Sequence, residues 1–237
     1  MAAPQQMLLS QKIAAGGGGD AFTFESSATG TSDTWDITVD KPTGTASGDL
    51  LVACVMINGS AQPDNMSGGA TWNALAQHFA GSPASGYTRV FWKIAGGSEP
   101  STYTVGTTDS NGEKTVAVLR YSLAASAALN IDGTKGELTT TEADPTIAAP
   151  TITTTVNGCM LINMSCLSMA AGVAGCDISA PSGYTRRAII HSNNRAWLAV
   201  SDAIQSTAGA TGTVNAASDT GAGTAGWLAR MAAFEPA

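Results

Sequence analysis

The sequence predicts an all-β protein, an antiparallel β-sandwich of jelly-roll or lectin-like type. After residue 20, short runs rich in Val, Ile, Thr, Tyr and Trp recur along the chain, and clusters of Gly, Pro, Asn, Asp and Ser separate them. These turn signals recur at the spacing typical of a sandwich, and no run reads as a long helix. Charged residues make up 12% of the chain and apolar residues 43%, so we expect a polar surface with few charges.

The amino-terminal segment, residues 1–19, is predicted to be a flexible docking arm. It ends in Gly16–Gly19, and glycine-rich segments behave as flexible coil. Apolar anchors that would order on a partner protein precede the glycines: Met7, Leu8, Leu9 and Ile13. A disordered tail without a partner is the alternative, because chain termini commonly fray.

The expected strands form two sets. The first set covers residues 34–40, 49–57, 87–95, 102–107 and 114–122. The second set covers residues 150–155, 159–167, 184–192, 195–204, 211–218 and 226–234. Four tryptophans lie in these runs: Trp35, Trp92, Trp197 and Trp227. Because alternate residues around them are apolar, we expect these side chains to fill the sandwich interior.

The second set repeats the first with a period of about 110 residues. Gly48 and Gly158 open matching apolar runs at an offset of 110. Arg120 and Arg230 lie in matching runs at the same offset. The pentapeptide SGYTR, in contrast, occurs at 85–89 and 182–186, only 97 residues apart. Its two copies are therefore predicted at different structural positions, each where the chain leaves a Gly turn and enters a strand.

We predict one sandwich domain over residues 20–237, formed by the pseudo-repeats 20–126 and 127–237. Two separate small domains are the alternative. The linker would then lie within residues 125–145, because this segment is polar and rich in Ala.

The acidic balance of the chain excludes nucleic acid as a partner, because phosphate binding needs clustered Lys or Arg. The formal net charge is -7 and the pI is about 4.6. No stretch approaches the roughly 20 apolar residues of a membrane span. The apolar run Met7–Leu9 is also too short for a signal peptide. We therefore expect a soluble chain without a membrane span, made in the cytoplasm.

The four cysteines are expected to be small buried hydrophobic residues. Cys54, Cys159 and Cys166 lie in apolar strand-like runs, and no C-x-x-C pair or nearby His indicates zinc. A disulfide between Cys166 and Cys176 is the conceivable exception. The sequence predicts no metal and no cofactor.

No catalytic residues are predicted. His78 and His191 are the only histidines, and each lies near the end of a strand-like segment, where a structural hydrogen bond explains it better than catalysis. No G-x-S-x-G, H-E-x-x-H or Walker loop occurs, and no G-x-G-x-x-G lies between an expected strand and a helix. Acidic residues such as Asp36 and Asp40 are read as solvated surface charge rather than as paired carboxylates or a calcium loop.

Trp72 and Tyr184 are the candidate glycan contacts. Each follows a Gly turn and begins a strand-like segment, so each ring could be half exposed. A glycan platform needs an aromatic ring beside polar groups, but aromatic residues are only 6% of the chain. Sugar binding is thus permitted by the sequence and not indicated by it.

Many short blocks together resemble a recurrent domain of tailed-bacteriophage structural proteins of the tail-associated, fibre or capsid-decorating kind. The blocks include KPTGTASGDLLVACV, VFWKIAGGSEPSTYTV, TITTTVNGCMLI and PSGYTRR, and the resemblance covers about residues 35–236. The opening QQMLLS is similar to the short amino-terminal leader of such virion proteins. The family has no shared catalytic residues to carry over.

The resemblance implies a β-sandwich assembled into a virion in several copies, with a homo-oligomer expected and a trimer favoured. The partners would be other virion proteins of the capsid, neck or tail. We therefore expect a non-enzymatic structural component that docks through its amino-terminal arm. A carbohydrate-binding host-adhesion module, with a host surface glycan as partner, is the alternative. A polysaccharide-degrading enzyme ranks last because the paired-carboxylate signature is missing.

Overall fold

The computed structural model describes residues 21–75, 77–80, 86–124, 130–140, 146–169, 174–219 and 225–236. The strands of the first half are β1 (Phe22–Ser32), β2 (Ile37–Asp40), β3 (Leu50–Asn58), β4 (Pro63–Ser67), β5 (Asn73–Ala74), β6 (His78–Ala80), β7 (Gly86–Ile94), β8 (Thr102–Thr107) and β9 (Glu113–Leu123). The strands of the second half are β10 (Asn130–Thr140), β11 (Thr146–Ala149), β12 (Thr153–Thr154), β13 (Cys159–Met169), β14 (Ile178–Ser179), β15 (Thr185–Ser192), β16 (Ala196–Gln205), β17 (Gly209–Ala210), β18 (Val214–Ser218) and β19 (Ala225–Glu235). Within these ranges every regular element is a strand and every ladder is antiparallel, which confirms the predicted all-β sandwich.

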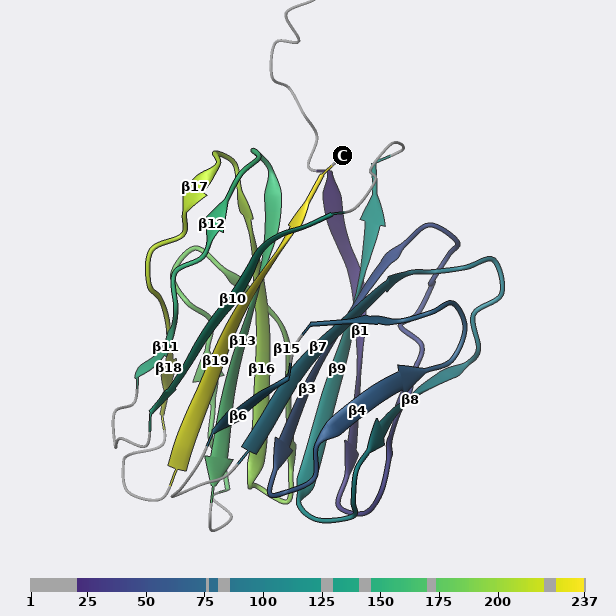
Figure 1. The fold of residues 1–237 in the computed structure, drawn as a ribbon, viewed down its shortest axis with the longest axis vertical. Helices are drawn as coiled ribbons and strands as arrows, with labels where there is room; N and C mark the ends of the chain where they lie inside the picture. Colours follow the sequence, from purple (N-terminus) through teal and green to yellow (C-terminus); the bar gives the residue numbers. More distant parts are fainter. Residues whose placement is uncertain are drawn as a thin grey trace, which may run out of the picture.

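Each half of the chain builds one large and one small sheet. In the first half the large sheet has the order β1-β9-β3-β7-β5, with β6 also paired to β7, and the small sheet has the order β2-β8-β4. In the second half the large sheet is β10-β19-β13-β16-β15, the small sheet is β11-β18-β14, and β12 and β17 form a short ladder of their own. The two large sheets face each other in the centre of the molecule. The small sheets lie on the outer sides, with β4 and β8 on the right of Figure 1 and β11 and β18 on the left.

The two halves have the same strand order. In each large sheet the first strand of the half lies at one edge, the last strand lies beside it, and the long apolar strand, β3 or β13, follows. Cys54 lies opposite Val90 in the first half. Met164 and Val200, which follow these two residues by 110 positions each, lie opposite each other in the second half. The jelly-roll assignment and the sequence repeat stay predictions, because a shared strand order by itself establishes neither.

The two SGYTR segments lie at different structural positions. Gly86 begins β7 in the interior of its sheet, where a Cβ atom would lie 3.0 Å from the Ile57 carbonyl oxygen. Gly183 lies in the turn before the edge strand β15, with a φ of 81° that favours glycine. The same pentapeptide therefore needs its glycine for two different reasons. At Gly86 the neighbouring backbone approaches closely, and at Gly183 the turn has a left-handed conformation.

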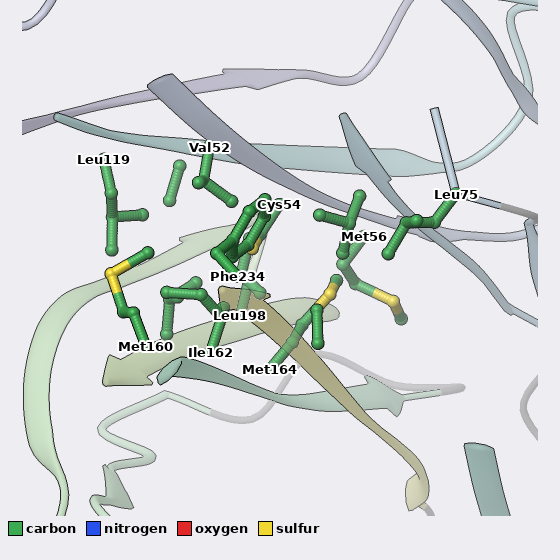
Figure 2. Packing of buried hydrophobic residues seen from close by; sticks show 14 of the residues in the cluster. Val52, Cys54, Met56, Leu75, Leu119, Met160, Ile162, Met164, Leu198 and Phe234 are labelled. Atoms are coloured by element: carbon green, nitrogen blue, oxygen red, sulfur yellow. The ribbon is translucent and has the colours of Figure 1, made fainter. Parts of the chain in front are cut away.

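Apolar side chains from both halves fill the space between the two large sheets. Figure 2 shows Val52, Cys54, Met56, Leu75 and Leu119 of the first half facing Met160, Ile162, Met164, Leu198 and Phe234 of the second. All but Leu75 are at most 2% exposed. Burying a side chain of this size contributes roughly 1.5–3 kcal/mol. We call this cluster the shared core, and it favours one domain over two separate ones.

Each half also has an outer core between its large and small sheets. Ile37, Val39 and Tyr103 belong to the outer core of the first half, and Trp197 and Trp227 belong to that of the second. These two tryptophans are buried as expected, and Trp92 packs against the shared core.

Trp35 corrects the prediction that all four strand-like tryptophans fill the interior, because its side chain is 59% exposed. The alternation of Trp35, Ile37 and Val39 would place all three on one face of a strand. However, β2 begins only at Ile37, after a bend over residues 33–35, and Asp36 Oδ1 between the bend and the strand accepts a hydrogen bond from the Thr107 N–H at 3.0 Å. The bend turns the indole away from the core.

All four cysteines are free and buried. Cys166 belongs to the shared core and Cys176 to the outer core of the second half, so the conceivable disulfide between them is not formed. Burial raises the pKa of the Cys54 thiol to about 12, and it also raises the pKa of Cys166. The thiolate is the reactive form of cysteine, so both side chains are protected from attack.

We expect a thiol reagent at about pH 8 to label the folded protein very slowly, since all four thiols are buried and burial raises the pKa of Cys54 and Cys166 above the value of about 8.5 of a free thiol. In denaturant, all four cysteines should react. The measurement is the absorbance released by an aromatic disulfide reagent, with and without urea. Rapid labelling of even one thiol in the folded state would contradict the burial described above.

None of the described segments contains a helix suited in length and hydropathy to crossing a membrane.

Candidate functional site

A cavity of about 400 Å³ opens between the two large sheets, at the end of the molecule where β1 begins and β19 ends. Its apolar lining includes Phe22 and Met160, which belong to the shared core. Its polar lining comes from β1, β15 and β16: Thr23, Thr185, Arg187 and Asp202. The cavity thus has an apolar side continuous with the core and a polar side near the edge strands β1 and β15.

Asp202 is the polar centre of this lining. Its Oδ2 accepts a hydrogen bond from Tyr121 Oη at 2.8 Å. Arg187 Nε donates to Oδ1 at 2.8 Å and to Oδ2 at 2.9 Å. The Asp202 side chain is 7% exposed and the Arg187 side chain 27%. Burial and the adjacent Asp202 carboxylate raise the pKa of Tyr121 well above its usual value, so the phenol remains a donor.

The Tyr121–Asp202 hydrogen bond joins the two halves of the chain. Tyr121 lies on β9 of the first half, and Asp202 lies on β16 of the second. On β16, Asp202 shares a face with Leu198 and Val200 of the shared core. Sequence reasoning missed this site, although an acidic residue in step with apolar positions of a predicted strand was a usable signal.

Arg187 keeps donors free toward the cavity. Its guanidinium carbon lies 4.3 Å from the centroid of the Phe24 ring, a cation–π contact. Beyond the bonds from Nε to Asp202, its Nη atoms make no hydrogen bond within the part of the chain that the structure describes. The neighbouring Arg186 points elsewhere, because it binds the Asp177 carboxylate at 2.5 Å. A register shift between Arg186 and Ala188 accompanies this separation.

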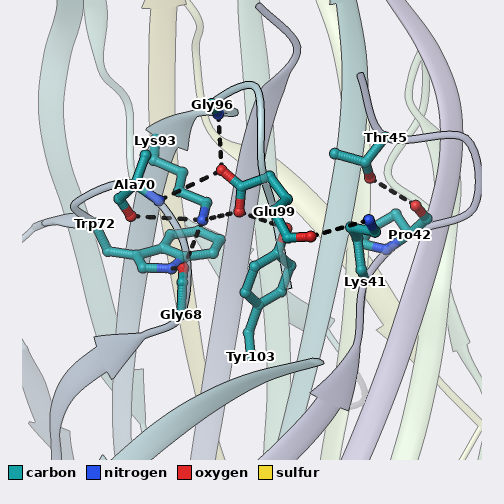
Figure 3. Close-up of polar contacts among 10 residues, drawn as sticks. All are labelled: Lys41, Pro42, Thr45, Gly68, Ala70, Trp72, Lys93, Gly96, Glu99 and Tyr103. Atoms are coloured by element: carbon teal, nitrogen blue, oxygen red, sulfur yellow. Dashed lines mark hydrogen bonds and ion pairs between the residues drawn. The ribbon is translucent and has the colours of Figure 1, made fainter. Parts of the chain in front are cut away.

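A second polar cluster lies in the outer layer of the first half (Figure 3). Lys93 Nζ lies 2.5 Å from Glu99 Oε2, and the side chains are 1% and 3% exposed. Lys93 also donates to the Gly68 carbonyl oxygen at 2.7 Å. Glu99 accepts hydrogen bonds from the Gly96 N–H at 2.7 Å and from Tyr103 Oη at 3.1 Å. This pair ties β7, β8 and the loop after β4 together.

Burial opposes both charges of the pair. It lowers the pKa of Lys93, against the opposing effect of the hydrogen bond to Glu99. Burial also acts to raise the pKa of Glu99, but the hydrogen bonds from Lys93 and from the Gly96 N–H outweigh it and hold that pKa below its usual value. The carboxylate form of Glu99 is therefore favoured, and the ion pair stabilises the contacts between β7, β8 and the loop after β4.

Trp72, one of the two predicted glycan contacts, belongs to this second cluster. Its indole N–H donates to the Gly68 carbonyl oxygen at 3.2 Å. The Lys93 ammonium lies 4.5 Å from its ring centroid, and the Tyr103 ring meets it edge-on at 5.2 Å. The Trp72 ring therefore already contacts the backbone and side chains of the protein itself.

Tyr184, the other predicted glycan contact, packs against the outer core of the second half. Burial raises the pKa of its phenol to about 12. Since Trp72 packs against the outer core of the other half, the structure does not bring the two rings together, and neither lines the cavity. Their role in glycan contact stays a prediction.

The remaining predicted residues have three different outcomes. The arm anchors Met7, Leu8, Leu9 and Ile13 lie outside the described residues, as does the side chain of His78. The His191 ring stacks on the Trp197 ring at 4.2 Å. Across the residues with described side chains, no group of three or more His, Cys, Asp or Glu is arranged to hold a metal ion.

No protein-family model matches this chain, and no curated protein or solved structure is significantly similar to it. The chemistry of the site therefore has to be argued from its own residues. Unused guanidinium donors, a bound carboxylate and an apolar wall suit the binding of a small polar ligand.

Proposed function

We propose that the chain is a non-enzymatic structural component of a tailed-phage particle, as a fibre, tail-associated or capsid-decoration protein. It would act in the virion after synthesis in the host cytoplasm, with other virion proteins as partners and a homo-oligomer, a trimer being favoured, as its working form. The arm over residues 1–19 would dock it, and the sandwich would be displayed outward.

The observation that supports this role is the shared core, which joins two layered halves into one body. Buried ionisable groups reinforce it by connecting elements. Lys93 binds Glu99, and Arg120 Nε binds Asp49 Oδ2 at 2.6 Å. Lys114 donates to carbonyl oxygens of the turns before β2 and β9, including Gly112 O at 2.8 Å. A rigid body of this kind suits a component that must keep its shape in a particle.

The arm is tested by deleting residues 1–19 from the full chain and measuring incorporation into particles. We expect a folded sandwich that no longer incorporates, because the apolar anchors are lost. A matched variant keeps the length of the arm and changes only Met7, Leu8, Leu9 and Ile13 to serine. Normal incorporation of either variant would rule out docking through the arm.

A carbohydrate-binding attachment module is the second candidate, and the cavity between the large sheets favours it. The cavity combines aromatic and apolar walls with a few polar groups, as small-ligand sites commonly do. Its location differs from the sequence-based expectation of Trp72 and Tyr184. The two candidate functions are compatible, because an attachment protein of a particle can bind a host surface glycan.

A further inference from the structure

The polar side of the cavity has more donors to offer than acceptors. An arginine side chain carries about five N–H donors, and in Arg187 only the N–H of Nε donates to Asp202. The Asp202 carboxylate can accept about four hydrogen bonds and already accepts from Tyr121 and Arg187. A ligand that supplies acceptors, above all a carboxylate, therefore matches the cavity best. Such a group binds a guanidinium with two parallel hydrogen bonds.

The apolar side of the cavity indicates the rest of the ligand. Phe22, Phe24 and Met160 line it, and the Phe24 and Tyr121 rings meet edge-on at 5.7 Å. A pyranose ring has an apolar face of C–H groups and a rim of hydroxyls, so it can contact this wall and the polar groups at once. A volume of about 400 Å³ accommodates a sugar unit of this size.

We propose that this cavity binds an acidic sugar, a pyranose that carries a carboxylate. The carboxylate accepts hydrogen bonds from the Nη atoms of Arg187, and the ring lies against the wall formed by Phe22, Phe24 and Met160. Asp202 holds the guanidinium in place through Nε, and Tyr121 in turn donates a hydrogen bond to Asp202. The inference rests on the second candidate function, carbohydrate binding, and names its ligand class and its site.

The test compares two glycosides that differ only at C6, methyl β-glucuronide and methyl β-glucoside, by calorimetric titration of the full chain. We expect the glucuronide to bind at least about tenfold more tightly, a difference of about 1.4 kcal/mol. Arg187→Gln should remove this preference, so that the two glycosides bind with affinities within about twofold of each other. Arg186→Gln is the matched control. It removes the adjacent arginine, which binds Asp177 and does not line the cavity, so it should change neither affinity.

Phe24→Leu is a second variant in case Arg187→Gln does not fold. It removes the Phe24 ring from the wall without removing a charge, and it should weaken the binding of both glycosides severalfold. Unchanged affinities in this variant would overturn the site. Sodium acetate is the probe for a carboxylate alone, and acetate binding as tight as glucuronide binding would overturn the sugar part of the proposal.

The outcomes also separate this inference from the function on which it rests. Equal binding of the two glycosides, lost in Phe24→Leu, would overturn the acidic-sugar inference and leave carbohydrate binding standing. A concentration of about 10 mM lies well above the dissociation constant of a millimolar site. If neither glycoside binds at this concentration, both the acidic-sugar inference and carbohydrate binding are overturned. The particle role is tested separately by incorporation.

Discussion

Replacing Phe234 with alanine should lower the free energy of unfolding by about 3–5 kcal/mol, the usual cost of removing a fully buried phenylalanine ring. Phe234 is 0% exposed and lies between the two large sheets (Figure 2). Its ring meets that of Trp92, from the first half, at a centroid distance of 6.2 Å. The substitution therefore leaves a cavity that both halves border. Urea denaturation followed by far-UV circular dichroism and by tryptophan fluorescence measures the effect.

The same experiment tests whether the halves unfold together. Because the shared core contains residues of both halves, the two probes should give coincident transitions in the unchanged protein and in Phe234→Ala. Two separate transitions, with only one shifted by the substitution, would show independent domains. Phe79→Ala is the matched control, since this ring is 48% exposed and, among the aromatic rings of the described residues, contacts that of Tyr87 alone. Its loss should cost less than about 1.5 kcal/mol.

The apolar strands could be predicted from the sequence because their pattern is local. The expected strand over 49–57 corresponds to β3 (Leu50–Asn58), and that over 159–167 to β13 (Cys159–Met169). β1 (Phe22–Ser32) was not predicted, because its small polar residues carry little apolar signal. It is defined by its ladder to β9, a partner about ninety residues away in the chain. Pairing of this kind depends on tertiary context rather than on local propensity.

Register is the second property that the sequence pattern did not supply. Arg120 and Arg230 match at an offset of 110, yet Arg120 lies opposite Leu51 while Arg230 lies opposite Met164 rather than Leu161. Their strands are thus shifted differently against their neighbours. A shift along a ladder changes which side chains meet, and no local composition reports it.

The pairing of residues from the two halves at the candidate site could not be predicted for a similar reason. Tyr121 and Asp202 are 81 residues apart in sequence, and they meet only because two sheets from different halves pack face to face. Trp35 shows the opposite error, since the alternation of apolar residues predicted a strand from residue 34, whereas β2 begins at Ile37, two residues after Trp35. The fold class depends on patterns within each segment, whereas the site depends on how segments are brought together.

Replacing Glu99 with glutamine should destabilise the protein by about 3–5 kcal/mol, because it leaves the Lys93 ammonium buried without its counter-charge (Figure 3). Glutamine keeps one acceptor oxygen, which can still accept from the Gly96 N–H, whereas its amide nitrogen replaces the oxygen that accepts from Lys93 and from Tyr103 Oη. The loss therefore combines the missing charge with the missing acceptor. Adding Lys93→Met should recover most of the loss, since an apolar side chain has no charge to compensate. Glu113→Gln is the control. It breaks the more exposed pair with Arg195, at 3.3 Å, and should cost less than about 1 kcal/mol.

The pH dependence gives this prediction a second readout. The folded-state pKa of Glu99 is lowered, so its contribution is present above the unfolded carboxyl pKa of about 4.3 and is lost as pH falls through the folded value. The unchanged protein should lose this contribution on acidification, and Glu99→Gln should not. In Glu99→Gln the buried Lys93, whose pKa burial lowers, should instead make stability rise as the solution becomes alkaline and the amine loses its proton. Parallel pH profiles for the two proteins, measured by urea midpoints, would contradict a buried ion pair, because a neutral cluster would titrate alike in both.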